Sequence, residues 1–283
     1  MSDDQLRNES TSELATAKRF DDRVKNYIAY RPKYPAAIVE FLRDELGLKP
    51  SSFIADVGSG TGILSELFLR NGNQVYGVEP NAAMRAAAED LLKDFPNFHS
   101  IDGTAETTGL PNASVDFATA GQAFHWFDTD KARAEFARIL KPEGYAVIIW
   151  NLRRTDSTPF LRDYESLLRR VGTDYAQVAQ SYAQEKDLQR FFANNYGVRK
   201  FDNHQHFDFA GLRGRSLSAS YVPLAGQPGH EDLLAGLQEL FARHQQGGTV
   251  TFEYDTEVYF GKVSSFQFSV FSQNNSCLLK TEN

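Results

Sequence analysis

Short apolar runs alternate with amphipathic segments through the first half of the chain. The strand-like runs are residues 51–57, 74–78, 97–101, 114–120 and 145–150. Apolar residues recur at helical spacing in residues 63–70, 82–95 and 132–140. Strands that alternate with helices of this length predict βαβ units and a parallel sheet, and the unbroken apolar run at 145–150 is typical of a strand covered on both faces.

The pattern changes after Asn151. Polar-rich helices are expected at residues 158–171, 175–194 and 230–246, and further strands at 198–209 and 250–260. These elements predict an α/β fold whose sheet is extended at one edge and carries a helical cap over its ligand face. The polar residues 1–18 are expected to form a disordered tail, and residues 263–283, without a clear pattern in most of their length, a C-terminal tail.

Composition and charge exclude some classes of binding partner. The chain has 283 residues, of which 41% are hydrophobic and 24% charged, with a net charge of -7. An acidic chain without a Lys/Arg cluster disfavours nucleic acid as a partner, and no apolar run is long enough to predict a membrane span. The lone Cys277 and the polar N-terminus, which lacks an apolar signal core, favour the cytoplasm.

A glycine-rich segment follows the first predicted strand. Gly58, Gly60 and Gly62 lie between that strand and a helix, where glycine lets the backbone approach a ligand. A tight turn without a ligand is the alternative. A dinucleotide fingerprint would place a small residue where Ile63 stands, so a pyrophosphate site is disfavoured.

Glu79 ends the second predicted strand, where a carboxylate can accept hydrogen bonds from ribose hydroxyls. The alternative is a solvated loop acid. The separation between the glycine segment and this acid favours a nucleoside ligand without identifying the nucleoside.

Taken together, five motifs resemble those of the class I, seven-stranded S-adenosylmethionine-dependent methyltransferases, in their small-molecule branch, which includes type 11 domains and relatives of the trans-aconitate methyltransferases. The motifs are residues 56–62, 78–84, 103–116, 121–127 and 140–145, and the N-terminal residues 27–35 also resemble this branch, including relatives of the trans-aconitate methyltransferases. The resemblance implies a seven-stranded, mostly parallel sheet with helices on both faces and a methyltransferase domain at 19–262, with cap elements at about 19–40, 151–195 and 210–246. It implies S-adenosylmethionine as the cofactor and these residues as its contacts: Tyr27, Arg31, Asp56, Gly58, Ser59, Gly60, Glu79, Pro80, Asn81, Met84, Thr104, Ala105, Glu106 and Gln122.

Two of these positions have particular implications. Many relatives carry Asp at the position of Thr104, so adenine is expected to depend more on the Ala105 backbone and on Glu106. Arg31 is expected to pair with the cofactor carboxylate, or else to anchor the N-terminal helix.

The acceptor side is less specific. His125 is the candidate catalytic residue, as a general base or acceptor-binding group, and its alternative is a structural histidine. Aromatic faces suit a sulfonium, but core packing is preferred for Phe124. Arg215 and Tyr221 are candidates for acceptor recognition or for interdomain packing. Alternating histidines at 204 and 206 lack an acidic cluster, so no metal is predicted.

The sequence therefore predicts a methyltransferase acting on a small molecule by O-, N- or carboxyl-methylation. The alternatives are a nicotinamide-dependent oxidoreductase and a non-catalytic protein that binds S-adenosylmethionine. Nucleic-acid methylation is disfavoured by the acidic charge and by residues 122–125, which lack the motif typical of DNA amino methyltransferases.

Overall fold

The computed structural model describes residues 30–173, 175, 185–219 and 221–263. It has one seven-stranded sheet in the order β3-β2-β1-β4-β5-β7-β6. The strands are β1 (Phe53–Val57), β2 (Gln74–Val78), β3 (Phe98–Ile101), β4 (Val115–Gly121), β5 (Leu140–Arg153), β6 (Gly197–Phe207) and β7 (Val250–Gly261). Strands β1 to β5 are mutually parallel where they pair, and β7 runs antiparallel to both β5 and β6. The predicted α/β class, the mostly parallel sheet and its extension at one edge are confirmed.

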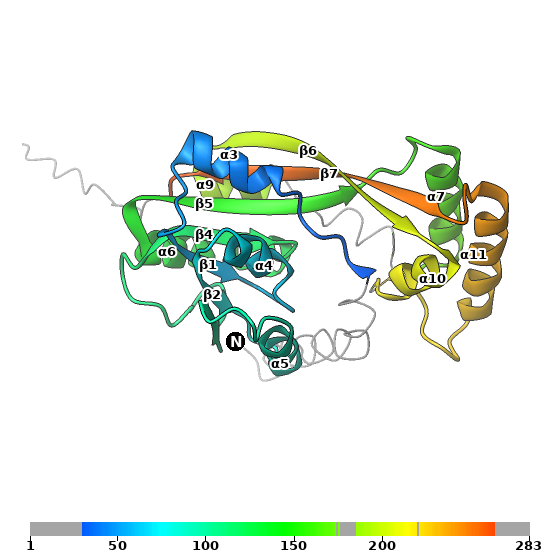
Figure 1. Cartoon of the computed structure of the whole chain (residues 1–283), viewed down its shortest axis with the longest axis horizontal. Coiled ribbons are helices and arrows are strands. Elements are labelled where there is room, and N and C mark those ends of the chain that lie inside the picture. Colours follow the sequence, from blue (N-terminus) through cyan, green and yellow to red (C-terminus); the bar gives the residue numbers. More distant parts are fainter. Residues whose placement is uncertain (1–29, 174, 176–184, 220, 264–283) are drawn as a thin grey trace, which may run out of the picture.

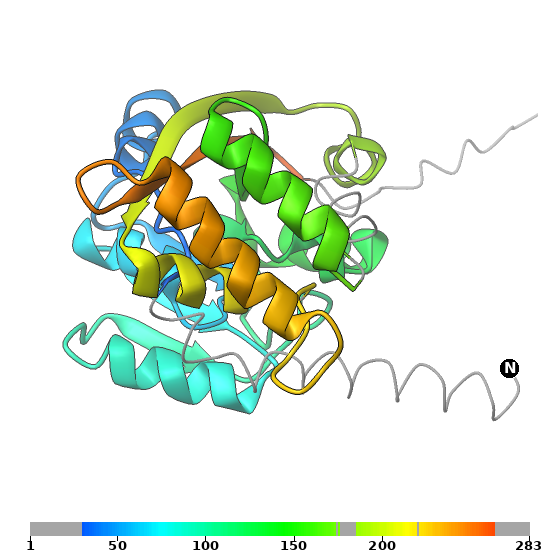
Figure 2. The same ribbon diagram turned by 90° about the vertical axis from the view of Figure 1, so that its right-hand side faces the viewer.

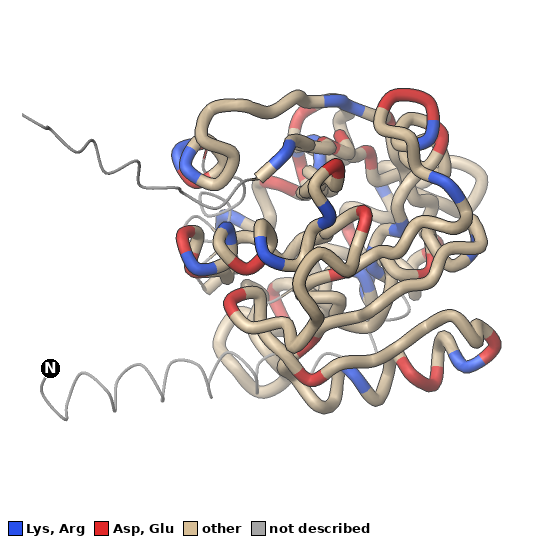
Figure 3. The backbone as a smooth tube through the Cα atoms, turned by 90° about the vertical axis from the view of Figure 1, so that its left-hand side faces the viewer, with Lys and Arg blue, Asp and Glu red and all other residues tan. Residues whose placement is uncertain are grey.

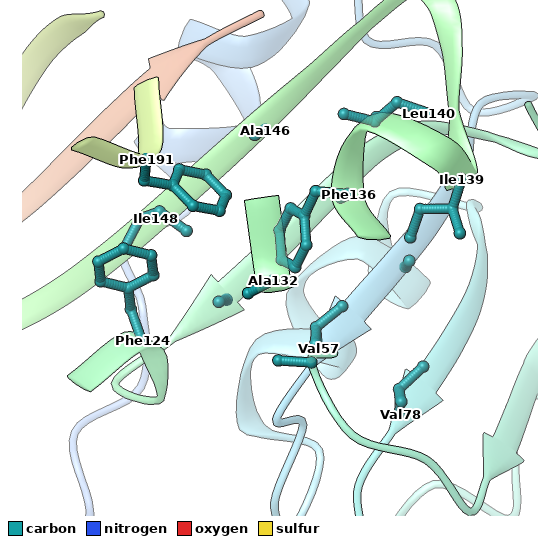
Figure 4. Packing of buried hydrophobic residues seen from close by; sticks show 14 of the residues in the cluster. Val57, Val78, Phe124, Ala132, Phe136, Ile139, Leu140, Ala146, Ile148 and Phe191 are labelled. Atoms are coloured by element: carbon teal, nitrogen blue, oxygen red, sulfur yellow. The ribbon is translucent and has the colours of Figure 1, made fainter. Parts of the chain in front are cut away.

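Helices cover both faces of this sheet. On one face lie α3 (Ala37–Leu46), α4 (Ile63–Arg70) and α5 (Ala82–Leu91); on the other lie α6 (Thr129–Ile139), α9 (Glu185–Phe192) and the short η1 (Phe124–Trp126). The alternation of side chains along β5 explains why both faces need cover. Ile148 packs with α6 and α9, as Figure 4 shows, whereas Val147 and Ile149 pack with α3 and α4.

Three helices form a second body beside the sheet: α7 (Pro159–Val171), α10 (Phe209–Leu217) and α11 (His230–His244). Figure 1 places them beyond the far ends of the long strands β5, β6 and β7, and Figure 2 shows α7 and α11 side by side. Their core includes Leu161, Leu212 and Leu237, together with Phe252 from β7. Strands β6 and β7 therefore contribute to the cores of both the sheet body and the helical body.

Two differences from the expected pattern have physical causes. The sequence predicted a cap element at about residues 19–40. Helix α3 packs on the sheet, however, so residues from Ala37 onward belong to the sheet body. Strand β5 extends to Arg153, beyond its apolar run, because its last residues still pair with β7. None of the helices in the described residues has the length and apolar character needed to cross a bilayer.

Candidate active site

A cleft of about 450 Å³ opens at the carboxyl ends of β1 and β4, where the strand order reverses. Such a switch point is the usual ligand crevice of an open α/β sheet. The lining comes from the N-terminal segment, the loop after β1, the start of α4 and the end of β4: Arg31, Pro32, Tyr34, Asp56, Gly58, Ser59, Gly60, Thr61, Ile63, Leu64, Gly121 and Gln122.

The loop after β1 takes a conformation that favours glycine. Gly58 and Gly60 have φ values of 69° and 56°, in the left-handed region. A Cβ atom on Gly58 would lie 2.5 Å from the Cβ of Ala123, so this position also excludes any larger side chain by contact. A Cβ atom on Gly60 would meet nothing within 4 Å, so the backbone there borders open space.

Glu79 holds this loop in place. Its Oε2 accepts a hydrogen bond from the Gly60 N–H (3.0 Å), and its Oε1 accepts one from the Asn81 N–H (2.9 Å). Burial raises the pKa of the Glu79 carboxyl, while the two N–H donors oppose that rise. Each carboxylate oxygen keeps a second lone pair. Glu79 can therefore fix the loop and still accept a hydroxyl hydrogen bond.

Asp56 is fully buried at the end of β1. The Ser65 hydroxyl donates to its Oδ2 (2.6 Å), whereas Oδ1 has no hydrogen-bond partner among the described residues. Burial raises the pKa of the Asp56 carboxyl to about 7. A cationic ligand group beside Oδ1 would favour the ionised form.

Two other residues of the cleft also have a buried oxygen atom that accepts no hydrogen bond in the described part of the chain. These atoms are Thr61 Oγ1 and Gln122 Oε1. The Gln122 Nε2 donates to the Asn151 carbonyl (3.1 Å), which directs Oε1 to the other side. Gln122 also has a φ of 58°, which is uncommon for a residue other than glycine. Each unsatisfied buried group costs about 1–3 kcal/mol, so three of them lining one cleft indicate a ligand that donates hydrogen bonds.

Arg31 brings a positive charge to the same cleft. Its Nη2 donates to the Ser218 carbonyl (3.1 Å), just after α10. The two alternatives for Arg31 are thus both compatible with its position, because the side chain lines the cleft and also ties the N-terminal segment to the helical body.

The other predicted cofactor contacts lie along the ends of β2 and β3. Asn81 caps α5 by accepting from the Met84 N–H (3.0 Å); Met84 is buried and Pro80 is exposed. Ala105 is buried, and the Glu106 Oε1 accepts from the Asp128 N–H (2.9 Å). Thr104 Oγ1 accepts from the Glu106 N–H (3.3 Å). Tyr27 lies outside the described residues.

His125 lies on η1, shortly after Gln122 in the sequence, and is not among the residues that line the cleft. Burial lowers the pKa of its imidazole to about 4, so the ring is neutral at neutral pH. Its ring centroid is 4.7 Å from that of Trp126, which is 55% exposed. Phe124 is buried among Trp150 and Phe191, which confirms its preferred interpretation as a core residue.

Two polar residues of the lining that the sequence did not single out as site residues are Tyr34 and Thr61. A Cβ atom on Gly121 would lie 2.5 Å from the Tyr34 hydroxyl, so the end of β4 and Tyr34 are in close contact. Thr61 lies between Gly60 and Gly62, so its position in the glycine-rich loop could have identified it as a site residue. His204 and His206 are exposed on β6, and the described residues contain no cluster of three potential metal ligands.

Known proteins are similar to this chain in sequence and in fold. A methyltransferase domain family matches residues 55–148. An uncharacterized methyltransferase-like protein of Schizosaccharomyces pombe is 30% identical over 191 residues, which cover 67% of this chain and 72% of that protein. An uncharacterized methyltransferase of Mycobacterium tuberculosis is 31% identical over 153 residues, covering 54% of this chain and 60% of that protein.

A solved structure described as a type II methyltransferase from Anaeromyxobacter dehalogenans has a similar fold, with a TM-score of 0.63 and 21% identity over 84% of this chain and all of that one. The sheet order, the cleft at its switch point and these relatives define a class I methyltransferase. The chain belongs to the class I methyltransferase family, is an enzyme, and uses S-adenosylmethionine as its methyl donor.

Proposed function

We propose that this enzyme methylates a small molecule and that the described cleft holds the methionyl end of S-adenosylmethionine. The observation that carries this proposal is the set of three unpartnered acceptor atoms, Asp56 Oδ1, Thr61 Oγ1 and Gln122 Oε1, which belong to residues lining one cleft. An ammonium group has three N–H donors and would match them.

Arg31 complements this arrangement on the same cleft. A guanidinium forms charge-assisted hydrogen bonds with a carboxylate, and the methionyl end carries one. An amino-acid group is therefore matched at both ends by this lining, whereas a pyrophosphate would meet the Asp56 carboxylate.

The nucleoside end follows from the neighbouring strands. We assign the ribose hydroxyls to Glu79, and the adenine side to Thr104, Ala105 and Glu106. This assignment is supported by their positions after β2 and β3, next to the loop that Glu79 fixes. Glu106 already accepts from Asp128, so its contribution to adenine binding is limited to its remaining acceptor capacity.

The donor supplies an activated sulfonium methyl group, so the protein mainly positions the two reactants. The neutral imidazole of His125 can accept a hydrogen bond from an acceptor hydroxyl or amine. Its depressed pKa makes it a weak general base, which favours positioning over full proton removal.

Three features support a small, non-nucleic-acid acceptor and a cytoplasmic enzyme. The net charge is -7, and along the backbone in Figure 3 the Lys and Arg positions alternate with Asp and Glu positions. The lone cysteine is consistent with a reducing compartment.

Calorimetry with S-adenosylhomocysteine, NAD and a short DNA duplex tests this proposal. We expect S-adenosylhomocysteine to bind one molecule per chain, and NAD and DNA to give no binding heat. Tight binding of NAD would contradict the assignment of the cleft, and tight binding of DNA would contradict a small-molecule acceptor.

A further inference from the structure

Arg215 is a buried arginine on the last turn of α10, and only 5% of it is exposed. Its Nε donates to the Tyr254 hydroxyl (3.2 Å), and its Cζ lies 5.8 Å from the centre of the Phe252 ring. The guanidinium is therefore enclosed by aromatic side chains of the helical body and of β7.

Arg153, a second and largely buried arginine of this region, has the carboxylate partner that Arg215 lacks among the described residues. Arg153 donates to the Glu165 carboxylate (2.6 Å) and to the Tyr175 hydroxyl (2.8 Å), so its charge is neutralised. No carboxylate pairs with Arg215 among the described residues.

Tyr164, a phenol of the same region, does not supply the missing charge. Burial raises the pKa of Tyr164 to about 12, so this side chain is neutral at physiological pH. Aromatic faces and phenol oxygens lower the energy of a cation without neutralising it. A buried charge without a counter-ion is costly, so a ligand anion would relieve a cost that the described protein leaves uncompensated.

The free edge of the guanidinium suits a planar anion. The Nε atom donates to Tyr254, and the two Nη atoms have no hydrogen-bond partner in the described residues. Neither Nη atom is among the fully buried polar atoms without a partner. Two parallel N–H donors match the two oxygens of a carboxylate.

Contacts of α10 with the N-terminal segment link the surroundings of Arg215 to the cleft. Arg31 lines the cleft and donates to the Ser218 carbonyl, three residues after Arg215. The ring of Tyr30 packs against Gly214, where a Cβ atom would lie 2.0 Å from the ring. In Figure 1, α10 lies next to the N-terminal segment that begins at Tyr30, beyond the ends of the parallel strands.

A second connection runs through the sheet, between the cleft and the cluster formed by Arg153, Arg215, Tyr164 and Tyr254. The Asn151 carbonyl accepts from Gln122 of the cleft, and Arg153 lies two residues further along β5, about 7 Å away along a strand. The cleft and the cluster are thus connected by two independent segments.

We propose that Arg215 binds a carboxylate of the methyl acceptor, so that the acceptor is a small organic anion. This inference rests on the proposed function, because it takes the cleft as the donor site. Arg215 acts as a recognition residue for the acceptor and does not contact the donor.

The test uses protein saturated with S-adenosylhomocysteine and two matched pairs of probes, benzoate with benzamide and succinate with succinamide. Thermal shift and calorimetry are measured for the wild type, for Arg215→Met, and for Arg213→Met as the control on the exposed face of the same helix. We expect at least one carboxylate to bind the wild type and the control, and its amide not to bind. In Arg215→Met, that carboxylate should bind at least about tenfold more weakly.

The unliganded variants separate recognition from a structural role. Because Arg215→Met removes an uncompensated charge, it should be at least as stable as the wild type. Arg215→Lys keeps the charge on a single nitrogen and should weaken carboxylate binding less than Arg215→Met does.

Three results would overturn the inference: no probe carboxylate binding to the wild type, carboxylate binding that survives in Arg215→Met, or marked destabilisation of that variant. Its failure is distinguishable from failure of the donor site, because the affinity for S-adenosylhomocysteine is measured first. That affinity should stay within about twofold in all three variants.

Discussion

The end of the sheet and the helical body each contain a buried ionisable side chain that has no counter-ion among the described residues, and the two have opposite signs. Asp56 lies in the cleft after β1, and Arg215 lies on α10. The same energetic argument applies to both, because a buried charge needs a partner. In the proposals above, Asp56 binds the ammonium group of the donor and Arg215 binds a carboxylate of the acceptor, so each region would bind one of the two reactants.

The largest effect should come from removing a core aromatic side chain in each region. Phe136→Ala in the sheet body and Phe252→Ala in the helical body both empty fully buried sites, so each should cost about 3–5 kcal/mol of unfolding free energy. Because β6 and β7 contribute to the cores of both bodies, denaturant unfolding should remain a single transition in both variants. Two separate transitions in Phe252→Ala would show that the helical body folds on its own.

Replacing the loop-fixing carboxylate should have the next largest effect. Glu79→Ala removes the acceptor for two backbone N–H groups and for the ribose, so the affinity for S-adenosylhomocysteine should fall more than tenfold, or more than about 1.4 kcal/mol. Glu89→Ala, on the exposed side of α5, is the control and should bind as the wild type does. Equal affinities in a calorimetric titration of the two variants would remove the ribose assignment.

The cleft should also bind its ligand in a pH-dependent way. The pKa of Asp56 is about 7 in the folded protein, above its ordinary value of 3.8, so its contribution to stability is present below pH 3.8 and is lost as the pH rises through 7. An ammonium ligand favours the ionised carboxylate, so affinity for S-adenosylhomocysteine should rise between pH 6 and 8 with release of a proton. Calorimetry in buffers of different ionisation enthalpy measures that release, which should disappear in Asp56→Asn. A release that persists there would assign it to another group.

The smallest effect on binding should come from His125, which lies beside the cleft. The affinity of His125→Gln for S-adenosylhomocysteine should stay within about twofold of the wild type. The folded pKa of about 4 lies below the ordinary 6.5, so the unfolded chain binds more protons and stability falls as the pH drops through that window. Between pH 7 and 5 the wild type should lose at most about 2 kcal/mol that the variant keeps. Denaturant titrations at the two pH values measure the difference, and equal losses would show that His125 is not desolvated.

The comparison between the two regions also shows what the sequence can predict. The cleft loop was predictable because the left-handed φ values of Gly58 and Gly60 leave a signature in a few adjacent residues. Glu79 was also predictable from adjacent residues, because it directly follows a short, mostly apolar strand and so marks the end of that strand.

The surroundings of Arg215 were not predictable in the same way. Its neighbours come from α7, α10 and β7, which are far apart in sequence. No local pattern therefore indicates that Arg153 has a carboxylate partner and that Arg215 has none in the described part of the chain. Helix α10 itself contains Gly211 and Gly214 and has little amphipathic pattern, which obscures it in the sequence. Gly214 is required there by the close approach of Tyr30, a contact between distant segments.

The role of the cleft as the methionyl site is tested most directly by comparing S-adenosylhomocysteine with its analogue lacking the amino group, in one calorimetric titration series at pH 8. The analogue keeps the adenosine, the sulfur and the carboxylate, so it probes only the partner of Asp56, Thr61 and Gln122. We expect it to bind at least about tenfold more weakly, because three buried acceptors stay unsatisfied. Equal affinity for the two compounds would contradict the assignment of these three residues to the donor.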